Sequence, residues 1–141
     1  MTNKVSKVFV LDTDHLSLYG RNHPKIVARL QEAQSPLKTT AINLEEQLRG
    51  RLAQVAQARD DASKSIAYLW LTETVTLLSE FQILQYDPKA QEIYQTLKHL
   101  RIGTQDLRIA SIVLANDATL LTRNLKDFEK ISELSIQDWS I

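Results

Sequence analysis

The pattern of apolar and polar positions begins with four apolar residues at 8–11, which run directly into the acidic tripeptide 12–14. A continuous run of mostly β-branched and aromatic residues predicts a buried strand of the kind found in parallel sheets. Asp12 then lies at the carboxyl end of this strand, the edge where open α/β sheets bind ligands. Asp14 is better placed to cap a short helix over 15–19. Asp12 is left without an evident structural role, unless both acids are simple turn residues.

Strands and helices alternate along the rest of the chain. Apolar stretches predict strands at 37–42, 81–86, 119–122 and 134–139. Helical spacing predicts helices at 24–34, 44–59, 60–80, 88–100 and 104–116, with a helical turn at 124–130. The helix at 104–116 is apolar nearly all round and should be buried. This order predicts an α/β protein, a three-layer α/β/α domain with a mostly parallel central sheet.

Polar residues mark the expected helix starts. Asn43 stands three positions before Glu46, which is the spacing of a capping box. Further expected caps are Asp60 or Asp61, Asp87 followed by Pro88, and Thr104. The two helices over 44–80 should pack as a hairpin. Its contacts are expected from Leu48, Leu52 and Val55 against Ile66, Leu69 and Leu71 or their neighbours.

Composition narrows the class of protein. A chain of 141 residues fits one domain over 1–141. Basic and acidic residues each number 17, so binding of a polyanion would need a local basic patch or a metal. The absence of cysteine excludes disulfides and thiolate metal sites and is typical of a reducing cytosol. Without a run long enough for a signal peptide or a bilayer span, we expect a cytoplasmic protein that does not contact membranes.

Acidic residues recur where parallel strands end and the following helices begin. Asp12 ends the first strand, whereas Glu46 and Asp106 lie in the first turns of two helices. Asn124 and Asp127 follow the fourth strand. Such carboxylates would repel one another unless a hard cation such as Mg²⁺ is bound between them. A capping box would also explain Glu46, and the helix dipole would favour Asp106 without any chemistry.

Other polar residues are weaker candidates. His15, His23 and His99 show no spacing of a ligand set, so we expect surface or packing roles. Gly50 falls inside a helix, where it costs about 1 kcal/mol relative to alanine, so either a close backbone approach or a kink should explain it. Arginines flank the acids and could clamp phosphate, although solvated arginines are common on helices. They are Arg49, Arg51, Arg101, Arg108 and Arg123.

Four segments together resemble a known family. They are VLDT at 10–13, EQLRG at 46–50, GTQDLRIA at 103–110 and LTRNLKDF at 121–128. In this order they are similar to the PIN-domain ribonucleases, specifically the VapC-type toxins of bacterial type II toxin–antitoxin systems. The resemblance extends over essentially the whole chain. One departure is Asp14, since the family usually has Asn or Ser at that position.

The resemblance implies an endoribonuclease that depends on Mg²⁺ or Mn²⁺. Asp12, Glu46 and Asp106 match the first three of four family acids, and either Asn124 or Asp127 occupies the fourth position. Asp12 and Asp106 would anchor the metal, while Glu46 would hold a metal or orient the water. Thr122 could support a metal-bound water, and Arg49, Arg108 and Arg123 could contact RNA. The resemblance also implies a homodimer and a small antitoxin that covers the active site.

Three other functions are compatible with the sequence. The first is a nuclease acting on DNA or on structured RNA. The second is a Mg²⁺-dependent phosphatase-like enzyme, in which Asp14 would be the second of two essential acids, although no clear essential lysine follows a later strand. The third is a non-catalytic PIN-like interaction module, but such a module would be expected to lose Asp12 or Asp106.

Overall fold

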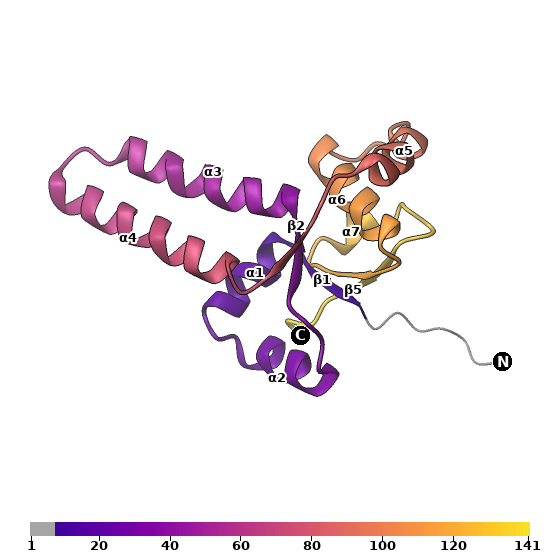
Figure 1. Ribbon diagram of the computed structural model, residues 1–141, viewed down its shortest axis with the longest axis horizontal. Helices are drawn as coiled ribbons and strands as arrows, with labels where there is room; N and C mark the ends of the chain where they lie inside the picture. The colour runs from indigo at the N-terminus through magenta and orange to yellow at the C-terminus, as the bar shows by residue number, and fades with distance from the viewer. Residues whose placement is uncertain (1–7) are drawn as a thin grey trace.

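The computed structural model describes residues 8–141, in which short strands alternate with helices (Figure 1). The strands are β1 (Phe9–Leu11), β2 (Lys38–Thr40), β3 (Gln82–Leu84), β4 (Thr119–Leu121) and β5 (Ser135–Gln137). The helices are α1 (Thr13–Gly20), α2 (Pro24–Ala33), α3 (Ala41–Gln57), α4 (Asp61–Leu78), α5 (Pro88–Leu97), α6 (Thr104–Ala115) and α7 (Leu125–Phe128). This order confirms the predicted α/β class. The single domain predicted over 1–141 also includes residues 1–7, which lie outside the described residues.

The strands form two parallel groups that lie side by side. β4 pairs in parallel with both β1 and β5, and β2 pairs in parallel with β3. The hydroxyl of Thr39 in β2 donates a hydrogen bond to the backbone oxygen of Leu11 in β1 at 2.7 Å, which joins the groups. Every strand pairing within residues 8–141 is therefore parallel, as predicted.

Alternating side chains of the central strands enter two apolar cores, one on each face of the sheet. Val10 and Leu120 belong to the core shared with α5, α6 and α7. Leu11 and Leu121 belong to the core shared with α1 and α2. Burial on both faces explains why these strands are continuously apolar. The central helix α6 is buried over most of its length, as its sequence predicted.

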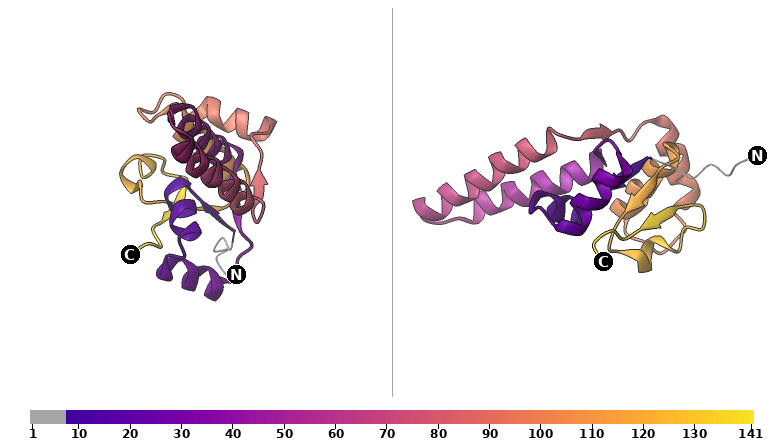
Figure 2. Two further views of the ribbon diagram at one scale, coloured as in Figure 1. Left: turned by 90° about the vertical axis from the view of Figure 1, so that its left-hand side faces the viewer. Right: turned by 90° about the horizontal axis from the view of Figure 1, so that it is seen from below.

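Helices α3 and α4 form the predicted hairpin, which extends away from the sheet (Figures 1 and 2). The predicted contacts are wrong at three positions, because Leu52, Ile66 and Leu69 are 56%, 48% and 55% exposed. The buried positions of α4 include the small residues Ala67 and Thr74. Several large apolar side chains of the hairpin therefore face outward, whereas the other predicted contact residues, Leu48, Val55 and Leu71, are half-buried. None of the helices within residues 8–141 has the length and apolar character needed to span a membrane.

Several helices begin at residues other than the predicted ones. Thr40, rather than Asn43, caps α3, because its hydroxyl accepts a hydrogen bond from the backbone N–H of Asn43 at 3.1 Å. The predicted strand 37–42 consequently ends at Thr40. Gly103, rather than Thr104, precedes α6. Two predictions are confirmed: the carboxylates of Asp60 and Asp87 cap α4 and α5.

Candidate functional site

The carboxyl ends of β1 and β4 place Asp12 and Thr122 next to each other. The backbone N–H of Asp12 donates to the carbonyl of Leu121 at 2.9 Å, which extends the pairing of the two strands by one residue. The hydroxyl of Thr122 then donates to Oδ2 of Asp12 at 2.8 Å. The single hydroxyl hydrogen of Thr122 is therefore used to orient the carboxylate of Asp12.

Asp12 occupies the position before α1 without capping it. Asp14, the predicted cap, lies instead in the first turn of that helix. The carboxylate of Asp12 accepts a second hydrogen bond, from Nδ2 of Asn43 at 2.8 Å, and is only 7% exposed. Burial raises its pKa, and the charge of Asp14 adds to this, while hydrogen bonds from Thr122, the Thr13 backbone and Asn43 oppose it. Asp12 is thus a buried carboxylate that polar groups hold in one orientation.

Glu46 lies on α3 and faces the start of α1. The hydroxyl of Thr13 donates to Oε1 of Glu46 at 3.0 Å and accepts a hydrogen bond from Nδ2 of Asn43, also at 3.0 Å. The predicted capping box between Glu46 and Asn43 is therefore wrong. Burial raises the pKa of Glu46, as does repulsion from Asp12 and Glu45, whereas the hydrogen bond from Thr13 and the charge of Arg49 lower it.

Asp106 enters the site from the first turn of α6. The amide of Asn124 bridges it to Asp127, because Nδ2 lies 3.3 Å from Oδ2 of each carboxylate. The pKa of Asp106 is raised to about 6, by burial and by the negative charges of Asp12, Glu46 and Asp127. The structure therefore brings together the four predicted acids, and Asp106 is the one most affected by the others.

This set of donors fits a hard divalent cation. The acidic oxygens repel one another, and a cation would remove the repulsion that raises the pKa of Asp106. Within residues 8–141, no group of three or more Asp, Glu, His or Cys side chains is gathered closely enough to hold a metal alone. Mg²⁺ commonly keeps several waters and shares its coordination with substrate phosphate, so a partial protein ligand set is sufficient.

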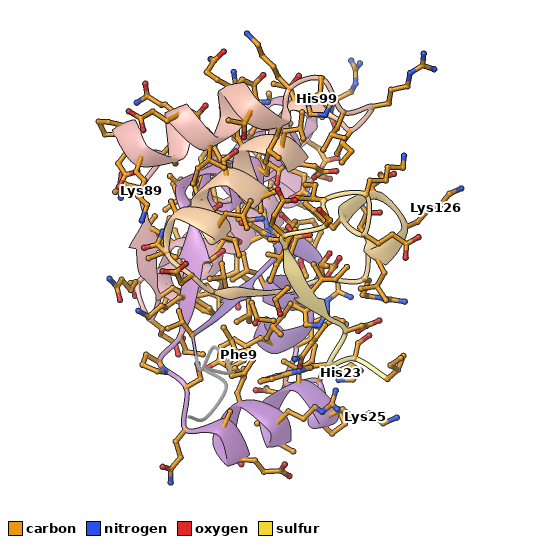
Figure 3. The ribbon with its side chains drawn as sticks, turned by 90° about the vertical axis from the view of Figure 1, so that its right-hand side faces the viewer. Phe9, His23, Lys25, Lys89, His99 and Lys126 are labelled. Atoms are coloured by element: carbon orange, nitrogen blue, oxygen red, sulfur yellow. The ribbon has the colours of Figure 1, made fainter. Side chains whose placement is uncertain are left out.

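Histidines do not contribute to such a site. His23 and His99 lie at opposite ends of the molecule (Figure 3), so they cannot belong to one ligand set. His15 lies in α1, is fully buried and hydrogen-bonds to Asp14 and Trp139, which agrees with the predicted packing role. The carboxylate and amide oxygens are the donors that remain, and they favour Mg²⁺ or Mn²⁺ over zinc.

Two of the arginines near the site, Arg49 and Arg108, already have partners. Arg49 forms an ion pair with Glu45. Arg108 donates to Oε1 of Gln105 at 2.9 Å and stacks over Tyr86 and Tyr94. The side chain of Arg123 is exposed, and Lys126 points outward from α7 (Figure 3). The RNA contacts predicted for these arginines remain predictions.

Gly50 lies in α3, where the sequence suggested a close backbone approach. A Cβ atom built on Gly50 meets no atom within 4 Å outside its own helix, so the expected close backbone approach is wrong.

A hollow of about 430 Å³ lies between α1, α3 and α4, with Ser17, Gln47 and Arg51 among its lining residues. None of the four acids lines it, so it is separate from the candidate site.

The sequence interpretation missed Thr13 and Asn43 as parts of the site. Both directly contact the acids, yet each has an ordinary local explanation as a turn or cap residue. One signal was present: Thr40 and Asn43, two polar residues with short side chains at the end of an expected strand, have the spacing of a cap and its partner. Only the neighbouring strand β1 reveals that Asn43 also reaches Asp12.

Known proteins share this arrangement of the chain. A model of the PIN domain matches residues 9–134. Ribonuclease VapC1 of Haemophilus influenzae (strain R2866) is 30% identical over 138 residues, which cover 94% of this chain and 98% of the relative. The structure of VapBC-1 from nontypeable Haemophilus influenzae matches with a TM-score of 0.74 and 26% identity, covering 95% of this chain and 99% of that one. VapBC2 from Rickettsia felis, bound to a DNA fragment from its promoter, gives a TM-score of 0.72 and 26% identity over 94% and 98%.

Proposed function

The chain belongs to the PIN domain family of VapC-like ribonuclease toxins, and from that premise we propose that it is an endoribonuclease dependent on Mg²⁺ or Mn²⁺. The observation that carries the proposal is the convergence of Asp12, Glu46 and Asp106 at one sheet edge. Their mutual repulsion contributes to the raised pKa of Asp106, which indicates a site built for a cation. A fold with lost function would have no reason to keep this repulsion.

Asp12 and Asp106 would hold the cation, with Glu46 beside them and Asp127 at the outer side. When bound, the cation would acidify an attacking water and neutralise charge that develops on the scissile phosphate. Thr122 and Asn43 keep both oxygens of Asp12 oriented for this task. The side-chain amide of Asn124 donates to Oδ2 of Asp106 and orients it in the same way.

Glu46 is the residue best placed to orient the water and accept its proton. Thr13 donates a hydrogen bond to its Oε1 atom, which holds the carboxylate and would leave Oε2 to accept the proton. Water would form a bond to phosphorus in line with the 3′ oxygen, whose bond to phosphorus breaks and which would take a proton from solvent water. The products would be a 5′-phosphate and a 3′-hydroxyl. Arg49, Arg108 and Arg123 are the candidates to bind the flanking phosphates of the RNA.

The partners follow from the same premise. Solved structures similar to this chain are VapBC complexes, in which the related protein is bound to its antitoxin. We propose that this chain acts on RNA in the cytoplasm, forms a homodimer, and is inhibited by a small antitoxin encoded beside it. Expression of the chain alone should stop bacterial growth, and co-expression of the neighbouring gene should restore it.

Cleavage of a labelled single-stranded RNA by the purified chain tests the activity. We expect cleavage with Mg²⁺ or Mn²⁺, none with EDTA, and none for Asp12→Asn, which removes an anionic ligand and keeps the side-chain shape. Asp61→Asn is the matched control, because Asp61 is exposed at the far end of the hairpin. Wild-type cleavage by a folded Asp12→Asn protein would refute the site. An equal rate on single-stranded DNA would favour the broader nuclease function.

A phosphatase-like function is less consistent with the geometry. It would require Asp14 to face the reaction, but one oxygen of Asp14 lies 2.6 Å from Nδ1 of His15 and the other accepts the backbone N–H of Arg123 at 3.1 Å. Hydrolysis of a phosphate monoester but not RNA would support it nevertheless. A non-catalytic module would bind its antitoxin and cleave neither substrate.

A further inference from the structure

A chain of hydrogen bonds connects the C-terminal segment, α1 and the loop after β4. The backbone N–H of Trp139 donates to Nε2 of His15 at 3.0 Å. Nδ1 of His15 lies 2.6 Å from Oδ1 of Asp14. Oδ2 of Asp14 accepts the backbone N–H of Arg123 at 3.1 Å. Residues separated by more than a hundred positions thus meet at one buried imidazole.

The direction of each hydrogen bond in this chain is fixed. A backbone N–H can only donate, so Nε2 of His15 must accept from Trp139 and carries no hydrogen. In the neutral ring the hydrogen then lies on Nδ1, which donates it to Asp14. Asp14 must therefore accept at both oxygens, from His15 and from Arg123. Only a carboxylate of this length provides two acceptors at these positions.

The anchored residue, Arg123, stands between two side chains that contact the acids. Thr122 donates to Asp12, and Asn124 bridges Asp106 and Asp127. The backbone N–H of Asn124 also donates to the hydroxyl of Thr122 at 3.0 Å. Displacement of Arg123 would consequently move both of the groups that orient the acids.

We propose that Asp14 and His15 form a positioning unit that holds residues 122–124 against the acidic site. The inference rests on the proposed function, since it assigns these residues to the same reaction. They would act through Thr122 and Asn124, without touching the substrate. The buried ring of His15 contributes rigidity, because it is fully enclosed and joined on its other side to the segment that carries Trp139.

Substitutions of Asp14 test the positioning unit in the full chain. Asp14→Asn leaves one acceptor oxygen for two donors, Nδ1–H of His15 and the backbone N–H of Arg123. If the hydrogen of His15 moved to Nε2 instead, the backbone N–H of Trp139 would lose its acceptor. Asp14→Glu keeps the charge but displaces the oxygens by one methylene, so it separates geometry from electrostatics. Asp61→Asn and Asp61→Glu are the matched controls on an exposed acid in another helix.

Two measurements need no RNA: hydrogen exchange of the Arg123 amide by NMR, and Mn²⁺ binding by calorimetry. We expect both Asp14 variants to exchange the Arg123 amide at least about tenfold faster and to bind Mn²⁺ about tenfold more weakly, as loss of a supporting partner does. The Asp61 variants should match the wild type. Circular dichroism confirms that each variant is folded.

Different outcomes separate this inference from the proposed function. Wild-type exchange and Mn²⁺ affinity in both Asp14 variants would overturn the positioning unit. Wild-type behaviour in Asp14→Glu alone would overturn it as well, because charge rather than geometry would then explain the effect of Asp14→Asn. If the wild type bound no Mn²⁺ and cleaved no RNA, the proposed function would fail, while exchange of the Arg123 amide would still decide whether Asp14 anchors the loop.

Discussion

The side-chain amide of Asn43 donates a hydrogen bond to Oδ1 of Asp12 at 2.8 Å, and both residues are buried. The hydroxyl of Thr40 donates to Oδ1 of Asn43 at 2.7 Å, which fixes the amide so that its nitrogen faces the acid. The same nitrogen donates to Thr13, the residue that contacts Glu46. A single buried amide therefore connects two carboxylates that the chain places 34 residues apart (12 and 46).

Replacement of Asn43 by aspartate should destabilise the cation-free protein. Asn43→Asp removes the donor to Asp12 and places a second carboxylate beside it, while the shape is kept. We expect the free energy of unfolding to fall by about 2 kcal/mol in EDTA, as for a buried polar group that loses its partner. Urea unfolding measures the change, and Mg²⁺ should reduce it. Gln95→Glu, at an exposed residue of α5, serves as the control for an amide-to-acid change and should stay within about 0.5 kcal/mol of the wild type.

The raised pKa of Asp106 predicts how stability depends on pH without metal. The folded protein binds this proton with a pKa of about 6, against 3.8 for an ordinary aspartate, so between these values the folded state holds more protons than the unfolded state. The free energy of unfolding should therefore decrease as pH rises from about 4 to about 6 in EDTA. Asp12 and Glu46, whose pKa values are also raised, act in the same direction.

Urea unfolding at a series of pH values tests this dependence. Asp106→Asn should flatten the decrease, because the amide does not titrate and also relieves its neighbours. With saturating Mg²⁺ the decrease should disappear or reverse, since the cation binds the ionised carboxylates. Identical pH profiles for Asp106→Asn and the wild type in EDTA would show that Asp106 does not experience the repulsion described here.

Gly50→Ala should stabilise the protein. Gly50 lies inside α3, and a Cβ atom there meets nothing within 4 Å beyond its own helix. Alanine is favoured over glycine in a helix by about 1 kcal/mol, so the melting temperature should rise and RNA cleavage should be unchanged. Gly20→Ala is the contrasting variant, because its Cβ would lie 3.0 Å from a methyl group of Leu77. A lower melting temperature for Gly50→Ala would contradict the open space at this position, and lost cleavage in a variant of unchanged stability would indicate that the hairpin needs glycine for function.

The sequence predicted that the acids converge because the carboxyl ends of parallel strands lie at one edge of a sheet, and the structure brings these residues together. The sequence could not show how the acids are held, because Asn43 and Thr40 compete as caps on local grounds. The contact between Asn43 and Asp12, together with the end of β2, decides between them. The local sequence pattern carries no information about such contacts between distant segments.

The hairpin shows a second limit of local pattern. Leu52 and Leu69 lie at helical spacing typical of a buried stripe, but the structure leaves both about half exposed. Periodicity reports that a helix has an apolar face, and it does not report what covers that face. Gly50 shows the same limit. Glycine is unfavourable inside a helix, so its presence suggested a close contact, but the structure shows open space there.

Asp127, a candidate for the fourth acidic position, is more exposed than Asp106. Asp106 is half-buried, and burial together with three other acids raises its pKa, whereas the side chain of Asp127 is 40% exposed and lies 3.6 Å from the ammonium group of Lys130. The charge of Asp127 is therefore already balanced by solvent and a cation. We expect Asp106→Asn to reduce cleavage by more than about a hundredfold, and Asp127→Asn to reduce it by about tenfold or less, as outer groups around metal sites do.

Asn124→Asp provides the complementary test. It replaces the amide that bridges Asp106 and Asp127 with another carboxylate, so the protein should be less stable in EDTA and should bind Mg²⁺ more tightly. Titration of Mg²⁺ against single-turnover cleavage compares all three variants. If Asp127→Asn shifts the Mg²⁺ dependence as far as Asp106→Asn does, then Asp127 binds the cation directly. Such a result would reverse the ranking, because it would mean that α7 moves toward the sheet edge when the cation binds.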